Sequence, residues 1–266
     1  HSTLGAYQET KDKFINPARL DRFKDKSLNV LDICFGLGYN TSLLFNILIN
    51  QSTIVKWYGL EIDKRPLHYA LNEKKFIELW DPKVIEILKS LHLKSAYRSK
   101  QFNCSLLLGD ARQKIFNIPE KIKFDLIFLD GFSPQKCPEI WSYEFLSQLK
   151  NKIKYEGYLI TYTSSAAVRK SLKNLGFNLF NIVPILSKRS RWSNGTLATF
   201  DDNQDNPYIK QLSLMEIEHL NTKASIPYRD PTGEMLSKEI LEIRKKEQQF
   251  SNLLDTNYWR KKWEMA

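Results

Sequence analysis

The segment from Lys123 to Trp141, KFDLIFLDGFSPQKCPEIW, combines the pattern of a buried strand with a carboxylate at its end. An apolar run from Leu126 to Leu129 stops at Asp130, and Gly131 then begins a loop. Continuous apolar runs are typical of parallel strands covered on both faces. In open α/β sheets, ligands bind beyond the carboxyl ends of such strands. We therefore predict that Asp130 orients a reacting group.

A strand also leads into a glycine turn and a helix in the segment LDICFGLG, which ends at Gly38. Gly36 and Gly38 allow the backbone to approach a ligand closely, and the helix N-terminus offers free N–H groups. A dinucleotide and S-adenosylmethionine both fit such a turn. The dinucleotide fingerprint needs a third glycine where Thr41 stands, so that fingerprint is incomplete. A simple tight turn is the alternative.

Carboxylates mark the ends of further predicted strands. Glu61 follows Gly38 by 23 residues, where an acid can accept hydrogen bonds from ribose hydroxyls. Asp110 is placed to accept from the exocyclic amine of adenine, because carboxylates pair well with N–H donors. A single acid at a strand end can be a helix cap. Together with Asp32 and Asp130, however, these acids favour a nucleoside ligand.

Composition limits the class of protein. The chain has 266 residues, of which 42% are hydrophobic, enough for one large α/β core. Its net charge of +10 suits a polyanionic partner such as a nucleic acid, although a solvated, lysine-rich surface is an equal alternative. No apolar run approaches the roughly 18 residues that a membrane helix needs. We expect no membrane association.

The cysteines and histidines show no ligand-like spacing. Cys34, Cys104 and Cys137 are odd in number and form no CxxC pair, and the four histidines lie apart from them. This pattern favours neither a disulfide framework nor a zinc site. We expect no metal and a reducing, cytoplasmic location.

Strands and helices alternate from Ser27 onward, which predicts a mostly parallel sheet. We expect a tight loop at Gly36–Tyr39 that opens a helix through about Asn50. Further helices are expected at 64–100 with a start at Asp81-Pro82, at 138–153 and at 166–175. The seven expected strands are 28–33, 54–60, 103–108, 124–130, 158–162 after a Gly157 turn, 177–183 and 196–200, the last two forming an antiparallel pair.

The two ends of the chain differ in their sequence pattern from this alternating region. Residues 1–26 are polar, with an expected turn at Asn16-Pro17, and form an N-terminal segment. Residues 27–200 form the expected α/β domain. Residues 201–266 form a helical, basic tail with expected helices at 212–220 and 237–255.

The motifs CFGLGYN, GLEID, LLLGDA, FDLIFLDGFSPQKCPEIW and GYLITYTSSAAVRKSLKNLGF resemble the methyltransferase domain of the MnmC family, which modifies the wobble uridine of tRNA. The similarity covers about residues 28–200, and the N-terminal STLGAYQET is similar to the family's substrate-side segment. The resemblance implies that residues 27–200 are an S-adenosylmethionine-dependent methyltransferase domain with a class I Rossmann-like fold, and that residues 1–26 lie on its substrate side. It implies methyl transfer from S-adenosylmethionine to the amine of 5-aminomethyl-(2-thio)uridine in tRNA.

The resemblance also implies roles for individual residues. Asp130 would face the amine, with Tyr7 and Glu9 closing over it. The expected donor-binding residues are Asp32, Gly36, Gly38, Asn40, Glu61, Ile62, Asp110, Ala111 and Asp130.

The sequence departs from the family pattern in two respects. Cys34 stands where the first glycine of the loop is usual, which would alter the backbone approach to the methionine part of the donor. The 66 residues after residue 200 are too few for a flavin-dependent oxidase domain. We therefore expect a stand-alone methyltransferase without flavin, and we expect it to be a monomer.

Aromatic and basic side chains are the candidates for contact with the tRNA anticodon arm. Phe132 and Trp141 would stack on the uracil, although core packing is the alternative for Trp141. Lys136 would contact phosphate or carbonyl oxygen, unless it is an ordinary surface lysine. Further basic candidates, each equally open to being a solvated charge, are Lys188, Arg189, Arg191, Lys245, Lys246, Arg260, Lys261 and Lys262.

Three other functions compete with this interpretation. An aminopropyltransferase of the spermidine-synthase type shares the sheet, but its acidic loop would not match the basic balance here. A methyltransferase for another RNA base is the second. A non-catalytic RNA-binding protein on a methyltransferase fold is the third, and it would take up no S-adenosylmethionine.

Overall fold

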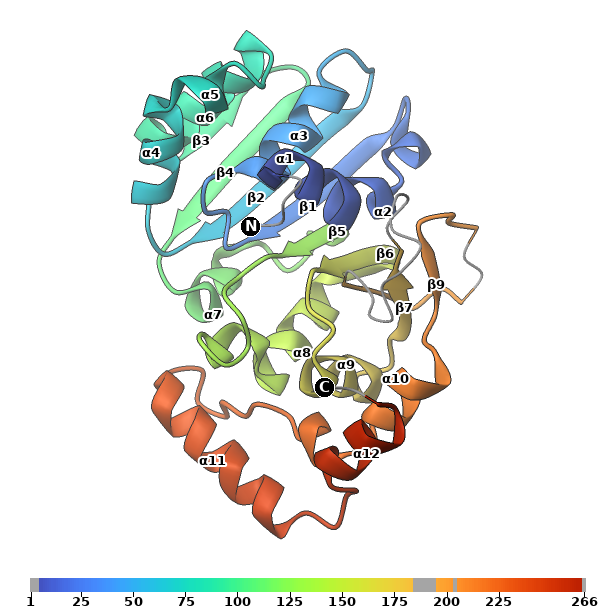
Figure 1. The fold of residues 1–266 in the computed structure, drawn as a ribbon. Helices are drawn as coiled ribbons and strands as arrows, with labels where there is room; N and C mark the ends of the chain where they lie inside the picture. The colour runs from blue at the N-terminus through green and yellow to red at the C-terminus, as the bar shows by residue number, and fades with distance from the viewer. Residues whose placement is uncertain (1–4, 184–194, 203–204, 265–266) are drawn as a thin grey trace. The chain divides into compact units, whose positions relative to one another are not determined.

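A computed structural model describes residues 5–183, 195–202 and 205–264 of the chain (Figure 1). The chain forms two compact units. The first unit comprises His1–Asp130 and Lys152–Thr161, and the second comprises Gly131–Asn151 and Tyr162–Ala266. The expected division at residues 26 and 200 stays a prediction.

The first unit contains a sheet with the strand order β3-β4-β2-β1-β5-β6. All neighbouring strands are parallel except β3 and β4. The strands are β1 (Ser27–Ile33), β2 (Ile54–Glu61), β3 (Ala96–Arg98), β4 (Phe102–Leu108), β5 (Phe124–Leu129) and β6 (Ile153–Thr161). This arrangement confirms the predicted Rossmann-like α/β class.

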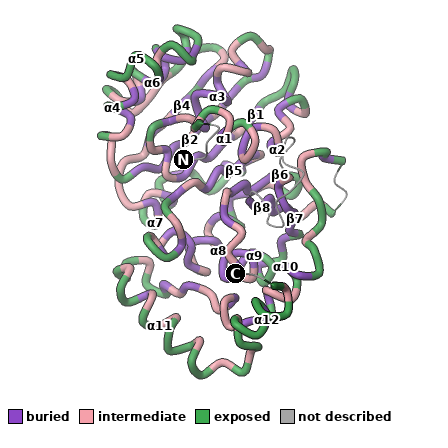
Figure 2. Tube along the Cα trace, viewed as in Figure 1, coloured by how far each residue is buried: buried purple, intermediate pink, exposed green. Residues whose placement is uncertain are grey.

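Burial explains why the central strands read as apolar runs. Val30, Ile33, Leu126 and Leu129 are completely buried, and Figure 2 shows β1, β2 and β5 as largely buried segments. Helices cover this sheet: α1 (Gly5–Thr10), the π-helical η1 (Lys11–Ile15), α2 (Asn16–Ala18), the 3₁₀ turn η2 (Leu20–Phe23), α3 (Tyr39–Leu48), α4 (Arg65–Asn72), α5 (Lys74–Ile77), α6 (Pro82–Lys94), α7 (Ala111–Lys114) and η3 (Ile115–Asn117).

The second unit contains an antiparallel sheet in the order β8-β7-β9. Its strands are β7 (Asn178–Ile182), β8 (Thr196–Thr199) and β9 (Ile209–Gln211). Its helices are η4 (Pro138–Trp141), α8 (Tyr143–Lys152, whose last residue belongs to the first unit), α9 (Ala166–Asn174), α10 (Leu214–His219), η5 (Lys223–Ser225), α11 (Ser237–Phe250) and α12 (Thr256–Lys262).

A buried cation connects four elements of the second unit. The Arg169 guanidinium on α9 donates to Glu216 Oε1 of α10 at 2.9 Å and to Asn181 Oδ1 of β7 at 2.7 Å. It also donates to Thr196 Oγ1 of β8 at 2.8 Å. Because a buried charge is stable only when it is paired and hydrogen-bonded, this network fixes α10 against α9, β7 and β8.

Several predicted boundaries were wrong. The region 64–100 does not end as a helix, because Ser95 adopts a left-handed φ of 56° and Ala96–Arg98 pairs with β4. The Gly157 turn is also wrong: Gly157 lies inside β6, which begins at Ile153, and an added Cβ there would stand 2.8 Å from the Phe124 carbonyl oxygen.

At the N-terminus, Asn16-Pro17 begins the helix α2 rather than a turn, since proline suits a first helical turn. The predicted Asp81 start of α6 is confirmed, because its side chain accepts the Lys83 N–H at 2.8 Å.

The described residues form nine strands instead of the expected seven, since β3 and β9 were missed. Within the described ranges, no helix is both long and apolar enough to span a membrane.

Candidate active site

The carboxyl ends of four parallel strands in the first unit meet at one edge of the sheet. Three backbone hydrogen bonds fix this alignment: the Cys34 N–H donates to Leu60 O at 2.9 Å, the Gly109 N–H to Glu61 O at 2.9 Å, and the Asp130 N–H to Ile33 O at 3.2 Å. The predicted residue Glu61 ends β2, and Asp110 and Asp130 follow β4 and β5 at this edge. The register predicted from the sequence is therefore present.

The turn between β1 and α3 uses left-handed backbone conformations. Gly36 and Gly38 have φ values of 56° and 87°, which glycine adopts without steric penalty. Cys34 has a φ of 63°, a left-handed conformation that glycine adopts more readily. The departure at Cys34 thus adds a side chain while keeping a turn that glycine would adopt.

Glu61 holds this turn closed through its carboxylate. Its Oε2 accepts the Gly36 N–H at 2.7 Å, and its Oε1 accepts the N–H groups of Ile62 at 2.7 Å and Asp63 at 3.0 Å. A carboxylate has about four acceptor positions, and these hydrogen bonds use three of them. Ile62 beside it is 75% exposed, which presents an apolar surface at the same strand end.

Asp130 is held by the first turn of α3. Asn40 Nδ2 donates to Asp130 Oδ2 at 2.8 Å, so the residue predicted to bind the donor also orients the predicted reacting acid. Burial raises the pKa of Asp130 to about 6, while the hydrogen bond from Asn40 and the charge of Lys13 oppose that rise. The carboxylate is therefore more basic than that of an exposed aspartate.

Asp32 lies one residue inside the end of β1 and is fully buried. Thr41 Oγ1 donates to its Oδ2 at 2.6 Å, while its Oδ1 has no partner. Burial raises the pKa of Asp32 to about 7, and the negative charges of Asp130 and Glu61 add to the rise. Thr41 is thus a site residue that the sequence reasoning considered only as a missing glycine.

Asp110 stands at the same strand edge but has its own cation. Its carboxylate caps α7 by accepting the Arg112 N–H at 2.9 Å, and it forms an ion pair of 2.6 Å with the Arg112 guanidinium. The hydrogen bonds from Arg112 keep the pKa of Asp110 low despite partial burial. Ala111 follows as a buried residue of α7.

An ion pair in the N-terminal segment affects the charge state of Asp130. Lys13 Nζ donates to Glu9, and both charges act on the Asp130 carboxyl group. The Phe14 ring meets the Phe128 ring edge-on at 5.7 Å, which places η1 against β5. Lys13 was not predicted; its i, i+4 spacing from Glu9 was the available signal.

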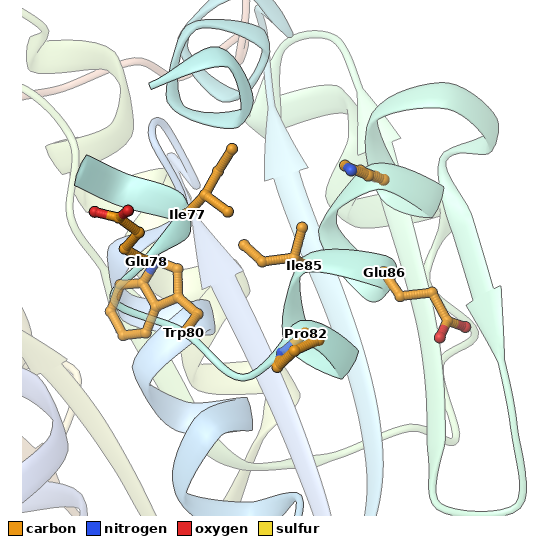
Figure 3. A pocket seen from close by; sticks show the side chains of 7 residues that line it. Ile77, Glu78, Trp80, Pro82, Ile85 and Glu86 are labelled. Atoms are coloured by element: carbon orange, nitrogen blue, oxygen red, sulfur yellow. The ribbon is translucent and has the colours of Figure 1, made fainter. Parts of the chain in front are cut away.

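Tyr7 contacts a group of aromatic side chains around Trp80, and its role over the substrate amine stays a prediction. Its ring is 5.6 Å from that of Trp80, which also meets Tyr39 and Phe76. Trp80 borders a cavity of about 530 Å³ between α5 and α6 (Figure 3). Its lining residues are Ile77, Glu78, Trp80, Pro82, Ile85, Glu86 and Lys89. The predicted site residues are not among them.

The loop after Asp130 belongs to the second unit. Phe132 is 78% exposed, as stacking on a base requires, and Lys136 is exposed. Trp141 is fully buried, and its Nε1–H donates to the Phe132 carbonyl oxygen at 2.8 Å. The stacking role predicted for Trp141 is therefore wrong in this structure, since the side chain supports the loop from the core.

The basic candidates divide into three groups. Lys188, Arg189 and Arg191 lie outside the described residues. Lys245 and Lys246 on α11, and Arg260 and Lys261 on α12, have exposed side chains. Lys262 forms an ion pair of 2.8 Å with Glu218.

Comparison with known proteins shows the family of the chain. Residues 73–198 match a family model described as S-adenosyl-L-methionine-dependent methyltransferase. The crystal structure of MnmC2 from Aquifex aeolicus is 31% identical with a TM-score of 0.76, covering 94% of this chain and 78% of that one.

Two curated relatives add sequence similarity over longer proteins. An uncharacterized protein of Methanocaldococcus jannaschii is 29% identical over 92% of this chain and 65% of its own length. The tRNA 5-methylaminomethyl-2-thiouridine biosynthesis bifunctional protein MnmC of Leptospira borgpetersenii is 29% identical over 65% of this chain and 28% of its own length. The chain thus spans less than two thirds of either relative. By its fold, its strand-end site and these similarities, the chain belongs to the S-adenosyl-L-methionine-dependent methyltransferase family that includes MnmC2 of Aquifex aeolicus.

Proposed function

We propose that the protein transfers a methyl group from S-adenosylmethionine to the primary amine of 5-aminomethyl-(2-thio)uridine at the wobble position of tRNA. The observation that carries this proposal is Asp130, a carboxylate of raised pKa at the end of β5 that Asn40 holds by a hydrogen bond. The similarity to proteins named for 5-methylaminomethyl-2-thiouridine biosynthesis supports the same substrate.

The residues at the sheet edge suit the methyl donor. Asp32 Oδ1 and Asn40 Oδ1 are buried acceptors without partners, and the ammonium group of the donor's methionine part needs such acceptors. Glu61 retains one acceptor position for a ribose hydroxyl, and Ile62 offers apolar surface to adenine. Asp110 would accept from the adenine amine beside its Arg112 pair. When bound, S-adenosylmethionine supplies an electrophilic methyl group on a sulfonium.

Asp130 prepares the amine for methyl transfer. An alkylamine has a pKa near 10, so only about one part in a thousand is neutral and nucleophilic at pH 7. The Asp130 carboxylate accepts an N–H hydrogen bond and turns the nitrogen lone pair away from itself. Because its pKa is raised to about 6, it also takes up a proton more readily than an ordinary aspartate.

Contacts with RNA complete the proposal. The exposed ring of Phe132 would stack on a base, which contributes about 1–3 kcal/mol per base. Lys136, Lys245, Lys246, Arg260 and Lys261 would contact phosphate oxygens, which makes binding strongly salt-dependent. Glu9 is proposed to meet the substrate amine together with Asp130, since both act near the same strand end.

Nucleoside mass spectrometry tests this function. Transfer RNA carrying 5-aminomethyl-(2-thio)uridine is incubated with the protein and S-adenosylmethionine, digested and analysed. The proposal expects the aminomethyl nucleoside to gain one methyl group. Methylation of another nucleoside, or transfer of an aminopropyl group from decarboxylated S-adenosylmethionine, would assign a different reaction. Failure to take up S-adenosylmethionine in calorimetry would point to a non-catalytic protein.

A further inference from the structure

A lysine belongs to the segment that packs on β5, the strand that ends at the acid proposed to receive the substrate amine. Lys13 belongs to the π-helical η1, which follows α1 and packs on β5 through the contact between Phe14 and Phe128. Its ammonium is bound to Glu9, and both side chains are about one quarter exposed. Irregular π-helical turns occur frequently at functional sites.

The charges near Asp130 come from each neighbouring element. Glu9 on α1 and Asp32 on β1 carry carboxyl groups, and Glu61 at the end of β2 adds a third through its effect on Asp32. The neutral Asn40 on α3 donates a hydrogen bond. Among these described neighbours of Asp130, Lys13 is the cation. Without it, the carboxylates alone would strongly favour a substrate amine in its protonated form.

We propose that Lys13 is a positioning residue that keeps the bound substrate amine in its neutral, nucleophilic form and aligns Glu9 beside it. The inference rests on the proposed amine substrate. A fixed positive charge near an ammonium disfavours that ammonium, as in enzymes whose reactive lysine is activated by a second cation. The proton leaves the substrate nitrogen for the Asp130 carboxylate and then for water. The nitrogen keeps its electron pair for attack on the methyl carbon.

The pH dependence of the chemical step distinguishes this role from a structural one. Single-turnover rates at saturating protein and donor report the groups of the bound complex. Lys13→Gln is expected to raise the apparent pKa of the acidic limb of the pH–rate profile by about one unit. At pH 7 the rate falls about tenfold and recovers as the pH rises. Lys13→Arg retains the charge and is expected to restore the wild-type limb.

Glu9→Gln provides an independent test with the opposite sign. Loss of a negative charge is expected to lower the apparent pKa of the acidic limb, whatever its effect on the maximal rate. Lys11→Gln, which removes an exposed charge two residues before Lys13, is the matched control and leaves the limb in place. Should Lys13→Gln fold poorly, the Glu9→Gln and Lys13→Arg profiles decide the question.

The outcomes separate this inference from the proposed function. If wild-type protein methylates no aminomethyluridine, the proposed function fails. If wild-type protein is active and Lys13→Gln lowers the rate equally at every pH, Lys13 is only structural and the inference fails. An unshifted limb in both Lys13→Gln and Glu9→Gln would overturn it as well.

Discussion

Asn40 Nδ2 lies 2.8 Å from Asp130 Oδ2, which joins the first turn of α3 to the end of β5. Asn40 follows directly on the glycine turn that is proposed to bind the methyl donor, while Asp130 is the proposed acceptor of the substrate amine. The pair therefore couples the position of the donor loop to the position of the reacting acid.

Removing the Asn40 amide should make Asp130 harder to ionise. The pKa of Asp130 is raised to about 6, and the Asn40 hydrogen bond opposes that rise. In Asn40→Ala the apparent pKa of the acidic limb of the single-turnover profile should therefore rise, and a rise of about one unit should lower the rate at pH 7 roughly twofold. Asn46→Ala, on the same helix, should leave the profile unchanged. An unmoved limb in Asn40→Ala would show that the hydrogen bond does not tune Asp130.

Asp130 should matter to the chemical step far more than to donor binding. We expect Asp130→Ala to lower kcat by about two to four orders of magnitude, the range typical of a general base. Affinity for S-adenosylmethionine, measured by calorimetry, should change little, because Glu61, Asp110 and the glycine turn remain. A fully active variant would remove Asp130 from the mechanism.

Asp32 should make the protein less stable as the pH rises. Its pKa is raised to about 7 in the folded protein from 3.8, so the folded state binds more protons than the unfolded state between these values. The stabilisation is fully present below the lower value and is lost as the pH rises through about 7. Asp32→Asn should therefore raise the melting temperature more at pH 8 than at pH 5.

The exposed Glu120→Gln is the control for Asp32→Asn, since it removes the same charge from the surface. It should shift the melting temperature little at either pH. Equal effects of Asp32→Asn at pH 5 and pH 8 would contradict the raised pKa of Asp32.

The left-handed conformation of Cys34 can be tested by substitution. Cys34→Gly should be neutral or stabilising, because glycine adopts a φ of 63° without strain. Cys34→Val should lower the free energy of unfolding by about 1–3 kcal/mol, since a β-branched residue is disfavoured there. Denaturant unfolding with and without S-adenosylmethionine measures both changes. Equal stability of the two variants would show that the turn relaxes.

The strand ends of the first unit could be predicted from sequence because their signal is local. Apolar runs such as Leu126 to Leu129 end in acids, and parallel pairing brings those ends together. Short elements were missed for the opposite reason. Ala96–Arg98 forms a strand because β4 is available to pair with it, and a segment of three residues is too short to show a pattern that predicts this pairing.

Side-chain partners at the site were predicted less well than positions. Asp110 reads as an open acceptor in the sequence, but Arg112 two residues later forms an ion pair with it. For Trp141 the sequence leaves stacking on a base and core packing open, and the complete burial of its side chain favours core packing. Lys13 acquires its proximity to Asp130 through η1, whose irregular turn no periodicity predicts.

The most direct test of the central claim follows the transferred methyl group. Transfer RNA with 5-aminomethyl-(2-thio)uridine is incubated with isotopically labelled S-adenosylmethionine and either wild-type protein or Asp130→Asn, and its nucleosides are analysed by mass spectrometry. The account predicts one labelled methyl group on the aminomethyl nitrogen with wild-type protein and almost none with the variant. Label on a different atom, or equal labelling by both proteins, would contradict it.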